Sequence, residues 1–515
     1  MQRTRRRTLQ AFPAVSFVLF TVLLLVCWVS QVIKAQTKDS TTGATPQAQY
    51  PSQIQLKFHR SPAEADAILS SIGGLLNFSS EHSGLPIRAQ VKGHLIDRDA
   101  VKQRIDAALQ KEDVMLRLER SSLALKKLGL IPRDFDLRSF LHDVQKDDAL
   151  AGYYDPATRD FYMLDWVPSK EQFPVMAHEL THALQDQYIG LQSWVEPPDR
   201  ADQGAADAKG RDELAIARRA VAEGQAMAVM VDYVLAPYSR TLTDLPVPDE
   251  SNMQKLMLSA THPAFLRAPR YIRESALFPY NYGLRFIYQV LKQDGKGRAF
   301  AGTLRTPPLN TRQVMHPAAY LASESIPPIT LPPLESVVGS NYEIQDSGTF
   351  GEFDTLMFAE QFGSEEKAPQ ISAQWRGGYY CAVHPVTKGA AAESEPSGTE
   401  KPPIEQKTSE RPGTVALFFI SRWATPAAAA QFAHLYASSV LERYSGATQC
   451  SKPAIAGQSA ATTSDWNTPE GLVSVESLGP LVLVMESFDN STASKLRSVV
   501  IGRGPSNNLH MSGAR

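Results

Sequence analysis

Residues 178–187 read HELTHALQDQ, and this stretch of the 515-residue chain decides how the rest is interpreted. On a helix, residues four apart lie on the same face, so His178 and His182 can offer two imidazole nitrogens to one metal ion. Glu179 projects beside them. Zinc takes nitrogen ligands together with a carboxylate and keeps one position open in catalytic sites. The stretch therefore predicts a zinc helix, and the alternative is a solvated polar face that holds two histidines.

The expected helix covers residues 174–188, and its side chains divide into two faces at about 100° per residue. The polar face holds His178, Glu179, His182 and Asp186. The apolar face holds Met176, Leu180, Ala183 and Leu184. We therefore expect one face to pack on the core and the other to line a cleft.

A second expected helix at 212–235 supplies the third ligand. Its polar side chains between residues 220 and 236 are Glu223, Gln225, Asp232 and Tyr233. A carboxylate in such an apolar run is costly to bury unless it is paired or binds a metal. Glu223 is therefore the expected ligand, and the neighbouring Gly224 permits the close approach of another helix.

The sequence leaves alternatives to Glu223 as the third ligand open. Glu223 could form an ordinary ion pair with Arg219, four residues earlier, on an exposed edge of the helix. Glu213, in a less apolar context, and His262, in a loop-like segment, are competing ligands.

The pair His178 and His182 with a downstream Glu223 on its own helix resembles the gluzincin class of zinc metallopeptidases. Four stretches are similar to a group of exported bacterial metallopeptidases: 152–164 (GYYDPATRDFYML), 178–187, 220–226 (AVAEGQA) and 307–320 (PPLNTRQVMHPAAY). The resemblance covers about residues 90–320. It implies a zincin-like domain with one Zn²⁺ per chain, held by His178, His182 and Glu223, and with Glu179 as general base.

Departures from the known branches keep the substrate class open. Met227 stands where the thermolysin branch has an Asp four residues after the ligand Glu, and the Gly-x-Met-Glu-Asn motif of the aminopeptidase branch is absent. A three-histidine site is excluded, because Gln185 and Tyr188 occupy the positions where that motif requires Gly and His.

The expected mechanism is hydrolysis of a peptide bond by a metal-activated water. Zinc lowers the pKa of a bound water from ~16 to about 7 and polarises the scissile carbonyl. Glu179 accepts the proton of the water and returns it to the leaving amine. His316, Tyr280 and Tyr282 follow the ligand helices and are candidate donors to the oxyanion, although each also suits a purely structural role.

Two supporting roles are also expected near the zinc helix. Asp186 is a candidate acceptor for the ring of His182, and the alternative is a solvated acid at the helix end. The strand at 161–164 is a candidate edge for pairing with an extended substrate, and the alternative is a plain hairpin.

The expected fold class is α+β, with a mainly helical zincin-like domain at 85–335 that includes a short edge-strand sheet, and a smaller α+β domain at 336–515. Further expected elements are a strand at 91–96 and helices at 97–130 and 282–293. Expected C-terminal strands lie at 379–383, 415–420, 472–475 and 481–485, the last two joined by a Gly479-Pro480 hairpin. Between them a helix begins after the N-cap Thr425 and stops at Gly446.

Composition suggests segments outside these domains. Residues 36–84 are expected to be a polar linker or N-terminal extension, and 386–413 a disordered insertion. The remaining cysteines of the body, Cys381 and Cys450, could pair in an oxidising compartment or stay as two buried thiols.

The N-terminal segment 1–35 is typical of an export signal. Five basic residues and no acid accompany an apolar run at 12–33, which predicts either a cleaved signal peptide or an uncleaved anchor in the inner membrane. The body is therefore expected in the periplasm or outside the cell, and membrane contact only through this segment. The net charge of the whole chain is −2, so the rest carries −7 and favours no nucleic-acid partner.

These features together predict an exported zinc-dependent peptidase that acts on protein or peptide substrates. The alternative is a non-catalytic cell-envelope binding protein in which a structural zinc ion joins helices. The presence of Glu179 beside the ligands favours catalysis, because a structural site has no use for a general base.

Overall fold

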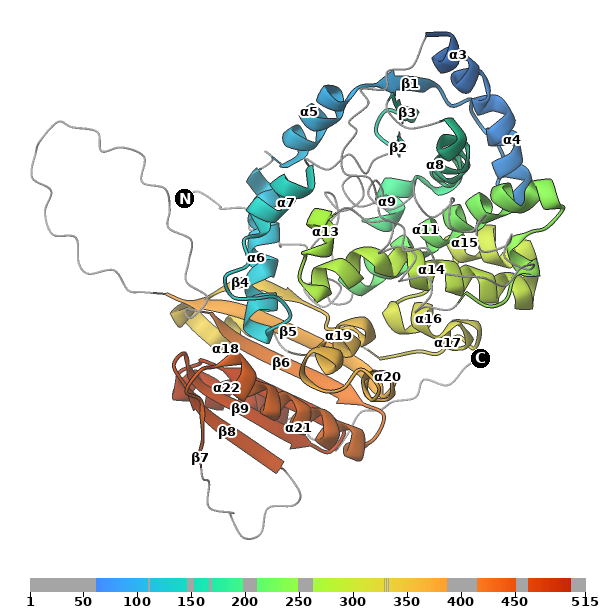
Figure 1. Ribbon diagram of the computed structural model, residues 1–515. Helices are drawn as coiled ribbons and strands as arrows, with labels where there is room; N and C mark the ends of the chain where they lie inside the picture. The colour runs from blue at the N-terminus through green and yellow to red at the C-terminus, as the bar shows by residue number, and fades with distance from the viewer. Residues whose placement is uncertain are drawn as a thin grey trace, which may run out of the picture. The chain divides into compact units, whose positions relative to one another are not determined.

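The computed structural model describes residues 62–109, 112–145, 152–165, 169–197, 211–248, 263–327, 329, 331, 333–386, 415–450 and 462–501 (Figure 1). The N-terminal segment 1–35, nearly all of the insertion expected at 386–413, and His262 lie outside these residues. Within the described ranges, no helix combines the length and the apolar character that crossing a membrane requires.

The chain is α+β and divides into two compact units. The first takes the described residues of 1–119, 134–202 and 211–325, and the second those of 120–133 and 326–515. The second unit thus begins about ten residues before the expected boundary and includes a segment from the N-terminal half of the chain.

The first unit is mainly helical. Its described helices are α3 (Pro62–Ser70), α4 (Ile72–Ser83), α5 (Arg98–Leu109), α7 (Leu137–Gln145), α8 (Ser169–Ile189), α9 (Leu191–Val195), α11 (Arg211–Leu235), α13 (Pro263–Leu266), α14 (Arg270–Gly297), α15 (Thr303–Arg305), α16 (Thr311–Met315) and α17 (Pro317–Leu321), with the start of α6 (Glu112–Leu128) and the short turns η1 (Ala236–Tyr238), η2 (Leu242–Asp244) and η3 (Arg298–Gly302). Helix α8 packs against α4 and α11, and α11 packs in turn against α14 (Figure 1).

A three-stranded sheet of the first unit lies against α8. Its strands are β1 (Gly93–Ile96), β2 (Gly152–Asp155) and β3 (Asp160–Leu164), in the order β1-β3-β2. β3 runs antiparallel to β2 and parallel to β1, so the predicted hairpin and the predicted strand near 91–96 are both confirmed. Because β3 is central, the expectation that residues 161–164 form a free edge is wrong, and the edges are β1 and β2.

Several helices of this unit are longer or earlier than expected. α8 begins before Pro174, where its start was expected, and α14 extends beyond both ends of the helix expected at 282–293. The single helix expected at 97–130 is α5 and α6. Helices α3 and α4 precede residue 85, and the Ser79 hydroxyl on α4 donates to the Ala177 carbonyl on α8. The region expected as a linker therefore contributes to the packing of α8.

The second unit is built on a seven-stranded antiparallel sheet. Its strands are β4 (Tyr342–Gly348), β5 (Trp375–Pro385), β6 (Ala416–Trp423), β7 (Thr448–Cys450), β8 (Thr462–Thr468), β9 (Gly471–Leu478) and β10 (Leu481–Glu486), in the order β4-β5-β6-β10-β9-β8-β7. Its helices are α18 (Leu334–Val338), α19 (Glu352–Phe362), α20 (Ala368–Ser372), α21 (Pro426–Arg443) and α22 (Asn490–Ile501), with the turn η4 (Gly339–Asn341). The four predicted strands, their Gly479-Pro480 hairpin and the Thr425 cap of α21 are confirmed.

Alternate residues of the central strands pack on opposite faces of this sheet. Phe418 belongs to a core that includes Leu496 of α22, whereas the Phe419 ring lies 5.8 Å from that of Tyr436 on α21. The sheet order also separates Cys381 on β5 from Cys450 on β7 by five strand steps, about 24 Å at the usual spacing. A disulfide needs Cα atoms within about 7 Å, so the disulfide alternative is wrong.

Candidate metal centre

Helix α8 is buried on both faces from His178 to Gln185, and only Asp186 and Gln187 of the HELTHALQDQ stretch are half-buried. His178, Glu179 and His182 are at most 1% exposed, and Leu180 and Leu184 of the opposite face are fully buried. The solvated-face alternative is therefore wrong. Polar groups held this far from water need partners inside the protein.

Helix α11 brings Glu223 to this buried face. A Cβ atom on Gly224 would lie 2.3 Å from the carbonyl oxygen of Gly283, so only glycine lets α11 approach α14 this closely. The close approach predicted beside Gly224 is confirmed. Glu223 is 1% exposed, which excludes the exposed ion pair with Arg219, whose guanidinium instead lies 3.2 Å from Glu196.

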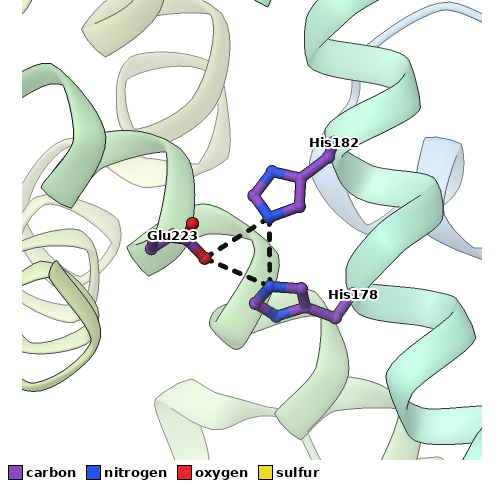
Figure 2. Close-up of side chains that lie close together, drawn as sticks. All are labelled: His178, His182 and Glu223. Atoms are coloured by element: carbon purple, nitrogen blue, oxygen red, sulfur yellow. Dashed lines mark hydrogen bonds and ion pairs between the residues drawn. The ribbon is translucent and has the colours of Figure 1, made fainter. Parts of the chain in front are cut away.

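The two imidazoles and the carboxylate converge on one point (Figure 2). Oε2 of Glu223 lies 3.2 Å from Nε2 of His178 and 3.3 Å from Nε2 of His182, and the two Nε2 atoms are 3.0 Å apart. Two ligand atoms of a tetrahedral zinc ion with bonds of about 2.0–2.1 Å lie roughly 3.3 Å apart. The donor set and its spacing thus fit a zinc ion without rearrangement.

Electrostatics in this cluster follow from burial and from the carboxylate. Burial lowers the pKa of His178 to about 4. Burial acts in the same direction on His182, but the Glu223 carboxylate overcomes it and raises the pKa of that ring. Burial also disfavours the charged form of Glu223, but the two rings hold its pKa well below the usual range. The carboxylate thus favours a positive charge at the point where the three side chains meet.

Glu179 lies beside the cluster with one oxygen held in place. Its Oε2 accepts a hydrogen bond from the backbone N–H of Tyr154 on β2, at 2.9 Å. Its Oε1 is buried and has no hydrogen-bond partner in the described structure. Burial raises the pKa of this carboxyl to about 8. Oε1, the oxygen without a hydrogen-bond partner, is therefore the atom that can exchange a proton.

The ring of His182 is held by Gln185 rather than by Asp186. Nδ1 of His182 lies 2.8 Å from Oε1 of Gln185, whereas Asp186 accepts hydrogen bonds from the Tyr154 hydroxyl at 2.9 Å and the Leu191 N–H at 2.8 Å. The expected role of Asp186 is therefore wrong. Sequence reasoning considered Gln185 only as a mismatch to the three-histidine motif.

The remaining candidate site residues from the sequence are Glu213, Tyr280, Tyr282 and His316. Glu213 on α11 accepts two hydrogen bonds from Thr311, both at 2.8 Å, and does not join the cluster. Tyr280 is buried on α14, and His316 lies between α16 and α17. Their roles as donors to an oxyanion stay predictions, as does that of Tyr282.

No family model, curated protein sequence or solved structure matches this chain.

Proposed function

We propose that this chain is an exported zinc-dependent peptidase of the gluzincin type, which hydrolyses peptide bonds in proteins or peptides outside the cytoplasm. The convergence of His178, His182 and Glu223 on one point, next to Glu179, carries the proposal. This donor set suits zinc, because imidazole nitrogen and carboxylate oxygen are its usual ligands in hydrolases. The arginine-rich and apolar N-terminus supports export.

In this proposal three side chains bind the metal and a fourth transfers the proton. His178, His182 and Glu223 would hold the metal, which when bound would acidify water and polarise a carbonyl group. The N–H of Tyr154 fixes Oε2 of Glu179, which leaves Oε1, without a hydrogen-bond partner among the described residues, as the oxygen that exchanges a proton. Glu179 takes a proton from the attacking water at Oε1 and returns it to the leaving amine.

One observation favours a second candidate, a structural metal centre in a non-catalytic protein. All four side chains are at most 1% exposed, so a substrate reaches them only if surrounding groups move. Structural zinc sites are closed in this way, whereas catalytic sites keep an open position. Against this, a structural site has no need of a buried carboxyl such as Glu179, whose desolvation costs stability.

Cleavage of a diverse peptide library by the zinc-loaded full chain, beside its Glu179→Gln variant, distinguishes the two candidates. The substitution preserves size and leaves the three ligands in place, but removes the proton acceptor. We expect the parent to cleave and the variant to lose two to four orders of magnitude in rate, about the usual contribution of a general base.

Glu213→Gln is the matched control, because it removes a buried carboxylate of α11 that lies outside the cluster. It should bind zinc and retain cleavage, provided that the variant remains folded. Equal cleavage by the parent and Glu179→Gln would refute Glu179 as the base. Bound zinc with no cleavage of any peptide would favour the structural centre.

A further inference from the structure

A chain of buried amides continues from the metal cluster into the core. Gln185 and Gln225, on α8 and α11, are both fully buried. Oε1 of Gln185 lies 2.8 Å from Nδ1 of His182, and its Nε2 donates to Oε1 of Gln225 at 2.8 Å and to the Ala222 carbonyl at 3.0 Å. Gln225 is thus connected to His182 through one intervening side chain.

The far end of this chain is anchored on two backbone carbonyls, which can only accept, and on the Thr303 hydroxyl, whose own proton goes to the Ala299 carbonyl at 2.7 Å. Nε2 of Gln225 lies 3.0 Å from the carbonyl oxygens of both Ala299 and Phe300, and 2.8 Å from the Thr303 hydroxyl. Ala299 and Phe300 belong to η3, a π-helical turn that follows α14. A backbone carbonyl cannot donate a hydrogen bond, so the amide of Gln225 must present its NH₂ group to this turn.

Because the Gln225 amide is fixed, it determines which group donates and which accepts in each hydrogen bond between Gln225 and His182. Its oxygen faces Gln185, so the NH₂ group of Gln185 must point toward Gln225, where the Ala222 carbonyl also requires a donor. The oxygen of Gln185 then faces His182 and requires a proton on Nδ1. The Nε2 lone pair of a neutral His182 is left to face Glu223 and His178, which is the form that binds a metal.

The two histidines differ in this respect. Nδ1 of His178 is buried and has no hydrogen-bond partner in the described structure. Of these two rings, that of His182 has a side-chain amide at Nδ1, which selects its tautomer and orientation. The His178 ring contacts Glu223 through Nε2, at 3.2 Å, and has no such support at Nδ1 among the described residues.

We propose that Gln185 and Gln225 are positioning residues that hold the His182 ring with Nδ1 protonated and Nε2 directed at the metal. The inference rests on the metal site of the proposed function and adds two residues to it. Neither glutamine touches the metal or the substrate. Gln225 acts only through Gln185, with the backbone of η3 as the fixed reference.

The test measures zinc dissociation constants of the full chain by competition with a chromophoric chelator. Partners that orient a metal-bound histidine typically contribute 10–100-fold to affinity, so we expect Gln185→Met to weaken zinc binding by about that factor. Gln225→Met should weaken it in the same direction. The double variant should be no weaker than Gln185→Met alone, because both substitutions break the same path.

Gln172→Met is the matched control on α8. Gln172 is 1% exposed, and its amide donates to the Leu164 carbonyl at 2.9 Å, away from the cluster. It loses a buried amide as the other variants do, and its zinc affinity should match that of the parent. A loss in Gln172→Met as large as in Gln185→Met, or independent additive losses in the double variant, would overturn the inference.

A second readout needs no metal and is made at alkaline pH, where the His182 ring is neutral. In the metal-free protein labelled with ¹⁵N-histidine, the parent should show His182 protonated at Nδ1, and both Gln185→Met and Gln225→Met should change that signal. An unchanged signal in folded variants would overturn the inference. A parent that binds no zinc would overturn it together with the proposed function, whereas this pattern of affinities without peptide cleavage would overturn only the peptidase.

Discussion

At the residue scale, two buried carboxylates of α11 show that burial alone does not identify a metal ligand. Glu213 is 3% exposed and Glu223 is 1% exposed, and they lie ten residues apart on one helix. Glu213 accepts two hydrogen bonds from Thr311, which satisfy a carboxylate without a metal. Glu223 faces two imidazole nitrogens, which together with its carboxylate could hold a metal ion. The chemistry of the partners therefore separates the two acids.

This contrast predicts the outcome of a paired substitution. Glu223→Gln removes an anionic ligand, and its zinc affinity should fall by more than the roughly 10–100-fold that loss of an outer partner causes. Glu213→Gln should leave the affinity within about threefold of the parent, because it alters only the contact with Thr311. Competition with a chelator measures both constants. Similar losses in the two variants would mean that Glu223 is not a ligand.

The sequence could predict the cluster of His178, His182 and Glu223 but not the residues that support it. His178 and His182 follow from helical spacing, and Glu223 follows from its isolation in an apolar run, because both signals are local. The direction of Gln185 depends on Gln225 from another helix and, through it, on the η3 backbone. Gln185 and Asp186 follow His182 by three and four residues, so helical spacing allows either side chain to reach its ring. The prediction from sequence therefore chose Asp186, because the bonds that direct Gln185 come from other elements.

At the element scale, the crossing of α11 and α14 positions Glu223. A Cβ on Gly224 would meet the Gly283 carbonyl at 2.3 Å, and backbone cannot move aside as a flexible side chain can. Gly224→Ala should therefore force the helices apart, lower the free energy of unfolding by about 1–3 kcal/mol and weaken zinc binding. Chemical denaturation and zinc competition measure the two effects.

Gly73→Ala provides the opposite case on α4. A Cβ at Gly73 meets no atom within 4 Å, and alanine in a helix is favoured over glycine by roughly 0.5–1 kcal/mol. This variant should gain stability and keep its zinc affinity. If Gly224→Ala behaved in the same way, the close crossing would not be needed to position Glu223.

The accuracy of the predicted elements depended on how apolar they are. β6 and β10 were predicted because their side chains are buried on both faces of the sheet, which leaves a continuous apolar run. β4 (YEIQDSG) and β8 (TTSDWNT) are polar and pair through their backbones, so no local pattern marked them. The helix expected at 282–293 is part of the longer α14, which tolerates the missing N–H of Pro279 within a long packed helix.

At the scale of the whole molecule, each unit has its own buried charges. The second unit contains Arg443 and Glu486, whose side chains are at most 2% exposed and 2.8 Å apart. Glu486 also accepts a hydrogen bond from the Tyr436 hydroxyl at 2.7 Å. His178, His182 and Glu223 belong to the first unit. A metal bound by them and this ion pair would therefore stabilise different cores.

The last prediction is that zinc and the Arg443–Glu486 pair act on separate unfolding transitions. A ligand that binds only the folded state stabilises it by RT ln(1 + [L]/Kd), so chelation should lower the midpoint of the first unit alone. Glu486→Gln leaves Arg443 buried without its partner charge and should destabilise the second unit by about 3–5 kcal/mol.

Glu476→Gln is the control for this substitution, because Glu476 pairs with Arg497, whose side chain is 43% exposed and can return to water. It should cost under about 1 kcal/mol. Calorimetry of the parent and both variants, with and without zinc, measures the midpoints. A single transition that shifts with both chelation and Glu486→Gln would contradict the prediction, because it would show that the two cores unfold as one cooperative unit.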